Sequence, residues 1–255
     1  MRLLLVQEIA IDTCMANPRH VLATVQKLDD HGLGVFSVWF AIPQPAVKFK
    51  SGQFLHLTLD SFAPEGGYWP ESRVFSIASA PKADTIRIVY SVKGRYTRRM
   101  SLELVEGRSV WLKYPFGDFV ADTRNPGTTV LVAGGTGISP FIGLFSGEER
   151  DMHSFWLYYG VRNSKLLIFQ HELERAVGNA GLNLEVSNED SGATSSSNLV
   201  TRFGKLNIES IFSRHSTDRS TRYYLSGPPS MIETFKLYLV DKGIDPRRIH
   251  IDSWE

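Results

Sequence analysis

The sequence predicts a β plus α/β fold, in which an antiparallel β-barrel is followed by a parallel sheet with covering helices. Residues 20–121 alternate strand-like apolar runs with turn residues, as at 34–40 and 52–59, and this pattern is typical of barrels. From residue 128 the chain changes to short buried strands separated by helical stretches, which is typical of parallel sheets. A polar, turn-rich stretch at 122–127 separates the two patterns.

These patterns divide the chain into three segments. We expect an N-terminal extension at 1–19, a barrel domain at 20–124 and an α/β domain at 125–255. The predicted strands of the α/β domain are 130–133, 155–159, 183–186 and 223–226. A stretch rich in Ser, Gly and Thr predicts a loop at 191–198.

Composition excludes several classes of protein. The 255 residues carry a formal net charge of +1, which excludes a strongly basic nucleic-acid binder. A single cysteine, Cys14, excludes an internal disulfide framework and any four-cysteine zinc or iron-sulfur site, and no metal site is predicted. No apolar stretch approaches membrane-spanning length, and the apolar run at 1–6 is too short for a signal peptide. We therefore expect a cytoplasmic protein that has no membrane span and binds no nucleic acid.

The most informative motif is a glycine-rich turn after a buried strand. Gly134, Gly135 and Gly137 follow the predicted strand 130–133, and a helix is predicted from 139–140. Glycines let backbone N–H groups approach a pyrophosphate, and the helix start points its positive end at the same anion. The turn therefore indicates a nucleotide site, although a glycine turn that serves packing alone has the same sequence.

A second motif lies upstream, in the strand-like run at 73–79. An arginine, an aromatic residue and a serine occur in the run Arg73-Val-Phe75-Ser76-Ile-Ala-Ser79, and at period two we expect these three side chains to share one face. An arginine neutralises phosphate, an aromatic ring covers a planar ring, and a serine hydroxyl bonds a ring nitrogen. The run is thus suited to a flavin, and the alternative is a surface strand with one basic residue.

A third motif follows the predicted strand 86–91. Gly94 permits a turn, and Thr97 is placed to cap a helix through 100–104. Three arginines, Arg95, Arg98 and Arg99, surround this helix start, which makes it a second anion site. Two separate anion sites imply two separate nucleotides.

Together these motifs resemble those of the ferredoxin-NADP reductase superfamily of flavoproteins. The family patterns R-x-[YF]-S-x-x-S, G-x-x-[ST] and G-G-T-G-x-x-P occur in order at 73–79, 94–97 and 134–140, and the late C-G-P-x-x-M occurs as S-G-P-P-S-M at 226–231. The similarity runs from about His20 to the end of the chain. The resemblance implies a six-stranded antiparallel Greek-key barrel that binds flavin, followed by a Rossmann-like parallel-sheet domain that binds NAD(P)H.

The resemblance also implies roles for single residues of the flavin site. Arg73 would contact the flavin phosphate, Phe75 would lie along the isoalloxazine ring, and Ser76 would reach its reactive nitrogen. The other residues implied at this site are Val74, Val89, Tyr90, Gly94, Tyr96 and Thr97. A pyrophosphate site at 94–97 favours FAD over FMN, because FMN has no pyrophosphate.

On the nicotinamide side, Ser226 stands where the family most often has a cysteine, beside the carbon that gives up hydride. Trp254 would stack on the flavin face that the nicotinamide must reach, and a frayed terminus is the alternative. The catalytic residues implied are therefore Ser76, Ser226 and Trp254. The residues implied to bind the nicotinamide nucleotide are Gly134, Gly135, Thr136, Gly137, Pro140, Arg162, Ser187, Gly227, Pro228 and Met231.

The choice between NADPH and NADH stays open at this level. Ser187 is present where the family often holds the 2′-phosphate, but Glu189 and Asp190 follow it, and acids repel a phosphate. Arg162 and Arg202 favour the phosphate. Resemblance to the stand-alone bacterial reductases favours NADPH slightly.

The function implied is a reductase that passes hydride from NAD(P)H to FAD and then single electrons to a ferredoxin or flavodoxin. Lys93, Arg95, Arg98 and Arg99 would then dock an acidic carrier. One alternative is the reductase component or electron-transfer subunit of an oxygenase or larger complex. Another is a non-catalytic nucleotide-binding regulator, which only the serine at 226 supports.

Overall fold

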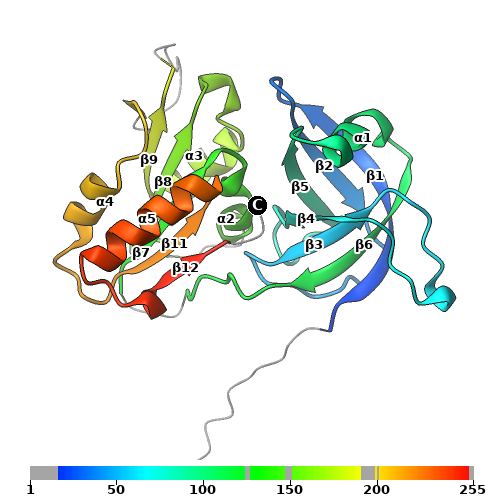
Figure 1. Ribbon diagram of the computed structural model, residues 1–255, viewed down its shortest axis with the longest axis horizontal. Helices are drawn as coiled ribbons and strands as arrows, with labels where there is room; N and C mark the ends of the chain where they lie inside the picture. Colours follow the sequence, from blue (N-terminus) through cyan, green and yellow to red (C-terminus); the bar gives the residue numbers. More distant parts are fainter. Residues whose placement is uncertain (1–16, 124–126, 147–150, 191–198, 200, 253–255) are drawn as a thin grey trace, which may run out of the picture.

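Two six-stranded sheets lie side by side and form the two halves of the molecule (Figure 1). The structure is a computed structural model, and it describes residues 17–123, 127–146, 151–190, 199 and 201–252. The predicted segments 1–19, 20–124 and 125–255 stay predictions, and most of the N-terminal extension, including Cys14, lies outside the described residues.

The first half is an antiparallel near-barrel with the strand order β4-β3-β6-β1-β2-β5. Its strands are β1 (Arg19–Asp30), β2 (Val35–Ala41), β3 (Phe54–Thr58), β4 (Arg73–Ser76), β5 (Thr85–Ser91) and β6 (Ser109–Phe116). Along β5 the inward side chains Ile86, Ile88 and Tyr90 are buried, because alternate residues of a strand face one side. The short helices of this half are η1 (Pro64–Gly66) and α1 (Arg95–Glu103).

The second half is a parallel sheet with the strand order β10-β9-β8-β7-β11-β12. Its strands are β7 (Thr129–Gly134), β8 (Phe155–Val161), β9 (Asn183–Asn188), β10 (Thr201–Phe203), β11 (Arg222–Ser226) and β12 (Ile249–Ile251). Its helices are η2 (Gly135–Ile138), α2 (Ser139–Phe145), η3 (Ser164–Leu166), α3 (Gln170–Ala180), α4 (Ile208–His215), α5 (Pro229–Asp241) and η4 (Pro246–Arg248). The predicted fold class is confirmed in both halves.

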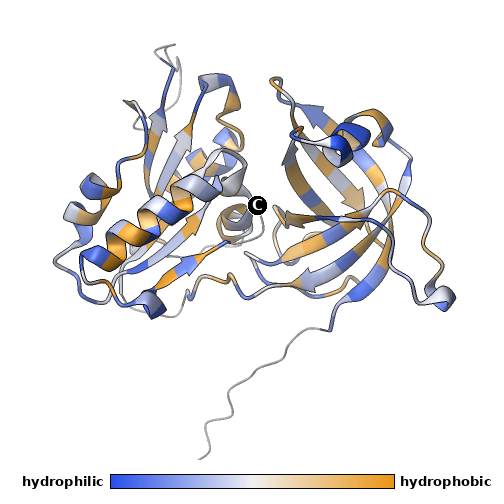
Figure 2. Cartoon of the chain, viewed as in Figure 1, coloured by the Kyte–Doolittle hydropathy of each residue, from blue (hydrophilic) through white to orange (hydrophobic). Residues whose placement is uncertain are grey.

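Helices cover both faces of the parallel sheet. One buried cluster joins the sheet to α2 and α3, and another joins it to α4 and α5. Along α5 the buried side chains Ile232, Phe235 and Leu239 recur at helical spacing, so apolar and polar residues alternate along this helix in Figure 2. β7 lies between these layers and is buried along its whole length.

The order of the strands creates a crevice at the carboxyl end of β7. The chain builds β8, β9 and β10 on one side of β7 and then returns to add β11 and β12 on the other. Ligands of open parallel sheets bind where the strand order reverses in this way. In this fold the carboxyl ends of β7 and β11 form that position.

The two halves share an apolar interface. The cluster under α2 includes Val35, Val89 and Phe119 from the barrel side, and the Phe119 ring lies 5.6 Å from that of Phe141 in α2. Helix α2 approaches the barrel backbone at Gly143, where a Cβ would lie 2.8 Å from the carbonyl oxygen of Ser79. The halves are therefore held in one arrangement around the crevice.

A buried ion pair also crosses this interface. Arg87 of β5 contacts Glu172 of α3 at 2.7 Å, and only 11% of the arginine side chain is exposed. Its guanidinium lies over the rings of Trp39 and Phe169, at 4.2 and 4.1 Å. Burial lowers the pKa of Arg87, and the hydrogen bond to Glu172 opposes that shift. The carboxylate thus compensates a charge that the interface has largely removed from water.

Glu172→Gln will therefore destabilise the protein. Removing one partner of a largely buried pair leaves the other charge uncompensated, and we expect a loss of about 1–2 kcal/mol in the free energy of unfolding, since the glutamate is partly exposed. Urea unfolding followed by tryptophan fluorescence measures this loss. Glu174→Gln on the same helix is the control, because Glu174 contacts the neutral Gln170. Equal stability of both variants would show that the cross-domain pair contributes nothing.

None of the helices within the described residues combines the length and apolarity that a membrane crossing requires.

Candidate functional site

The glycine turn after β7 packs directly on the turn after β11. A Cβ at Gly137 would lie 2.5 Å from the backbone nitrogen of Gly227 and 2.5 Å from the carbonyl oxygen of Ser226. Gly227 has a φ of 145° and is also crowded, with the nitrogen of Gly134 at 2.9 Å from its Cβ position. Only glycine permits this approach, so the two predicted motifs meet at one place in the fold.

A cavity of about 840 Å³ opens above these turns, between the two halves. The parallel-sheet half contributes most of its walls, and the barrel contributes Leu33, Val35, Ser91 and Lys93. The predicted nucleotide residues that line the cavity are Gly134, Gly135, Thr136, Arg162, Ser187, Pro228 and Met231. The other three predicted residues do not line it: Gly137 and Gly227 form the packed floor, and Pro140 is buried in α2.

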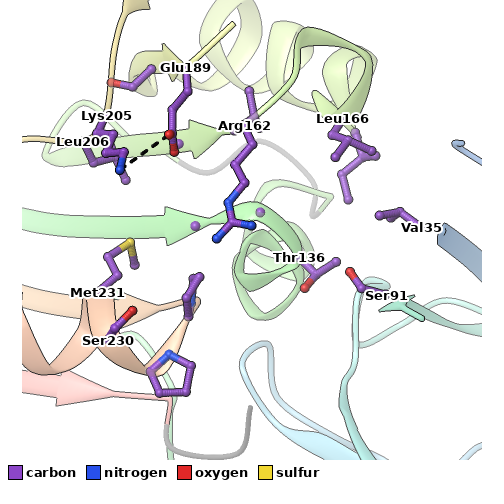
Figure 3. A pocket seen from close by; sticks show the side chains of 18 of the residues that line it. Val35, Ser91, Thr136, Arg162, Leu166, Glu189, Lys205, Leu206, Ser230 and Met231 are labelled. Carbon is purple, nitrogen blue, oxygen red and sulfur yellow. Dashed lines mark ion pairs between the residues drawn. The ribbon is translucent and has the colours of Figure 1, made fainter. Parts of the chain in front are cut away.

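Charged side chains line the cavity where β8 and β9 end. Arg162, which follows β8, is exposed and points into the cavity in Figure 3. Glu189 and Lys205 form an ion pair of 3.8 Å on the far side of Arg162 from Thr136 (Figure 3). Ser187 is nearly buried and also lines this end. Cationic groups and a hydroxyl are suited to bind a phosphorylated ribose.

Near the floor, one buried carboxylate joins the two halves of the site. The Ser226 hydroxyl, at the end of β11, donates to Asp252 Oδ2 at 3.0 Å. The Ser76 hydroxyl, at the end of β4 in the barrel, donates to the same oxygen at 3.3 Å. Asp252 is 2% exposed and Ser226 fully buried. The two serines predicted to be catalytic are therefore held together by one acceptor.

The resemblance to the family implied an acidic residue near the flavin at the end of the chain, but sequence reasoning missed the contacts of Asp252 with Ser76 and Ser226. The signal was the place of Asp252 directly after the last strand, β12, because residues that follow parallel strands meet at the carboxyl edge of the sheet. Trp254, the third residue predicted to be catalytic, lies outside the described residues. Its stacking on a flavin stays a prediction.

The prediction that Ser76 shares one face of its strand with Arg73 and Phe75 is wrong. Strand β4 ends at Ser76, and successive side chains of a strand point to opposite faces. Arg73 and Phe75 share one face, whereas Ser76 points toward Asp252 of the other half. The serine therefore faces the parallel-sheet half, away from the face that carries Arg73 and Phe75.

Arg73 and Phe75 rest on aromatic side chains of the barrel. The Arg73 guanidinium lies 4.7 Å from the ring centre of Tyr96, and its side chain is 47% exposed and paired with Glu71. Phe75 contacts Tyr90 edge to face, with ring centres 6.2 Å apart. Tyr90 is buried in the barrel, and burial raises its pKa well above the usual range. Val74 is half-buried, and Val89 packs in the interface cluster.

The helix at the second anion site begins earlier than its predicted cap. Helix α1 starts at Arg95 with Gly94 as its N-cap, so Thr97 lies inside the first turn. The Thr97 hydroxyl oxygen accepts from the backbone N–H groups of Lys93 and Gly94, at 2.9 and 3.1 Å. The threonine thus orders the turn from within. Arg73 lies over the ring of Tyr96 in the first turn of α1, and Arg95 is the first residue of that helix, so two cations at a helix start fit a pyrophosphate.

The comparisons with known proteins agree with this geometry. Residues 131–236 match the oxidoreductase NAD-binding domain family. Over 251 residues, 95% of this chain and 72% of the relative, the sequence is 26% identical to the ferredoxin-NAD(P)(+) reductase component of the naphthalene 1,2-dioxygenase/salicylate 5-hydroxylase systems of a Ralstonia species. The resemblance to the ferredoxin-NADP reductase superfamily, whose members bind FAD and NAD(P), is thereby confirmed.

Solved structures of two reductases share the fold of this chain. A ferredoxin NADP+ reductase from Neisseria gonorrhoeae with bound FAD and NADP is 19% identical with a TM-score of 0.69, over 93% of this chain and 98% of that one. A cytochrome P450 reductase from Amycolatopsis is 24% identical with a TM-score of 0.74, over 93% of this chain and 70% of that one. The flavohemoprotein of Bacillus subtilis is 24% identical over 82% of this chain, which spans only 52% of that protein.

Proposed function

We propose that this chain binds FAD at β4 and the start of α1, binds NADPH or NADH in the cavity, and passes hydride from the nicotinamide to the flavin. The observation that carries the proposal is the convergence of Ser76 and Ser226 on Asp252 Oδ2. The predicted flavin site and the predicted nicotinamide site thereby meet at one atom. FAD, when bound, supplies the conversion between two-electron and one-electron chemistry.

The main role of the side chains at this site is to hold its groups in fixed positions. Asp252 fixes two hydroxyls where both halves meet, and the packed glycine turns hold the floor of the cavity at β11. Positioning of this kind is the main source of catalysis when two rings must only be brought together. The serine at 226 keeps a hydrogen-bonding group at this position, anchored on Asp252.

The acceptor we propose is a small one-electron carrier protein of the ferredoxin or flavodoxin type. Support comes from relatives such as the Ralstonia reductase component, and from the electron transfer component of anthranilate 1,2-dioxygenase of Acinetobacter baylyi, 26% identical over 82% of this chain. Exposed basic residues near α1 suit an acidic partner. Arg99 is already paired with Asp60 and Glu103, each at 2.9 Å, and Arg95 with Glu71 at 3.6 Å. The docking surface we propose is therefore Lys93 and Arg98.

The relatives favour the view that this chain is the reductase component of an oxygenase system.

Steady-state electron transfer from NADPH and from NADH, through the FAD-loaded protein, to a ferredoxin and to a flavodoxin tests the proposed acceptor class. We expect reduction of at least one carrier, with a rate that falls as salt is raised because the docking is electrostatic. A flavin that nicotinamide reduces but that passes no electrons to either carrier would contradict the proposed acceptor class.

Arg162→Ala will shift the preference between the two donors. The 2′-phosphate is the only group that distinguishes NADPH from NADH, and Arg162 points into the cavity beside the charged end. Loss of a charge-assisted contact costs about 1.5–3 kcal/mol, so we expect KM for NADPH to rise about tenfold or more, and KM for NADH to rise less. Arg175→Ala, an exposed arginine on α3, is the control. Equal changes for both donors would mean that Arg162 does not contact the 2′-phosphate.

A further inference from the structure

One carboxylate lies between two arginines at the start of α1. Glu71 Oε1 is 2.9 Å from Arg73 Nη2, and Glu71 Oε2 is 3.6 Å from Arg95 Nη2. Arg95 is the first residue of α1, where the helix dipole favours negative charge. The two oxygens of Glu71 therefore use the same positive groups that a phosphate would use at this position.

Tyr96 contacts both residues of the Glu71–Arg73 pair, the first through its backbone and the second through its guanidinium. The Tyr96 hydroxyl lies 3.3 Å from the backbone carbonyl oxygen of Glu71 and 2.9 Å from that of Leu57. The ring of the same tyrosine lies under the Arg73 guanidinium, 4.7 Å from it, and Tyr96 itself is 3% exposed. One buried side chain thus anchors the backbone at Glu71 and supports the guanidinium of Arg73.

We infer that Glu71 competes with the pyrophosphate of FAD for Arg73 and Arg95, and that it thereby limits how tightly the flavin is held. The inference rests on the proposed function, because it takes FAD to be the ligand. An incoming pyrophosphate gains the arginines only by replacing the carboxylate, so each new contact is offset by one that is lost. Glu71 is then a residue that determines cofactor affinity without being a cofactor contact.

The effect of this competition on FAD affinity is modest and depends on the salt concentration. The side chains of Glu71 and Arg73 are 41% and 47% exposed, and ion pairs this exposed are weak. Removing the carboxylate will therefore tighten FAD by roughly threefold to tenfold at low salt. Near 1 M salt the Debye length is only about 3 Å, and the difference between the proteins will largely disappear.

The experiment compares three full-length proteins: wild type, Glu71→Gln and Glu65→Gln. The glutamine at 71 keeps the shape of the side chain and removes its charge. Glu65 lies in the exposed helix η1 of the same β3–β4 connection, so Glu65→Gln changes net charge equally without touching Arg73 or Arg95. The dissociation constant of FAD from the flavin-stripped proteins is measured by quenching of flavin fluorescence, at low salt and at about 1 M salt.

Tighter binding by Glu71→Gln alone, with the advantage lost at high salt, is the expected result. Unchanged or weaker binding would overturn the inference, weaker binding meaning that Glu71 prepares Arg73 for the phosphate. Equal tightening by both variants would also overturn it, because net charge would then be the cause. FAD binding by wild type keeps the proposed flavin site intact in each of these cases, whereas failure of all three proteins to bind FAD would overturn both.

A mutant cycle provides a second test. In wild type, Arg73 must leave Glu71 before it contributes to FAD binding, so Arg73→Ala removes only the net gain. In the Glu71→Gln background the full contact is lost, and the fold-change in FAD affinity caused by Arg73→Ala will be larger. A smaller or equal fold-change in that background would contradict competition between the two anions.

Discussion

Gly137→Ala will abolish efficient reduction of the flavin by NAD(P)H while leaving FAD bound. The added Cβ would lie 2.5 Å from backbone atoms of Ser226 and Gly227, and backbone cannot rotate away as a flexible side chain can. The turns after β7 and β11 must therefore separate. Overpacking of this kind costs about 1–3 kcal/mol of stability, and a displacement of about 1 Å at a reacting site costs about 100-fold in rate.

Two measurements distinguish a lost nucleotide site from a lost fold. Urea unfolding gives the change in stability, and a titration with dithionite checks that the bound flavin still accepts electrons from a small reductant. Gly178→Ala in α3 is the matched control, since a Cβ there meets nothing within 4 Å. Reduction of the Gly137→Ala protein by NAD(P)H at the wild-type rate would show that the two turns do not form the nicotinamide site.

Arg73→Ala will weaken FAD binding by about 10-fold to 150-fold, because a charge-assisted hydrogen bond contributes about 1.5–3 kcal/mol. The exposure of the Arg73 side chain, 47%, and its competition with Glu71 place the expected value toward the lower end. Fluorescence titration of the flavin-stripped protein measures the change. Arg98→Ala, which removes an exposed arginine of helix α1, will change the affinity little. Equal losses in both variants would mean a diffuse charge effect in place of a specific phosphate contact.

Local sequence patterns predicted most of the fold. Buried apolar runs gave β7, β8, β9 and β11 to within two residues at each end, because strands covered on both faces are apolar throughout. The glycine turn was visible because its glycines are nearly consecutive in the sequence. The contact that requires Gly137, with Ser226 and Gly227, lies far along the chain and was not predicted.

Features that depend on distant partners were not predictable in this way. Asp252 is significant because it meets Ser76, which is 176 positions away, and Glu172 because it meets Arg87 across the domain interface. Glu71 reads as an ordinary exposed acid until its contacts with Arg73 and Arg95 are known. The prediction that Ser76 shares a face with Arg73 and Phe75 was wrong, because Ser76 directly follows Phe75 in β4 and so points to the opposite face.

The most direct test of the proposed reductase function is an anaerobic titration of the FAD-loaded protein with NADPH and with NADH, followed by the visible absorbance of the flavin. We predict rapid loss of the oxidised flavin band with at least one of the two nucleotides. A protein that binds no flavin, or a bound flavin that dithionite reduces but neither nucleotide does, would contradict the proposed reaction and favour a nucleotide-binding protein without turnover.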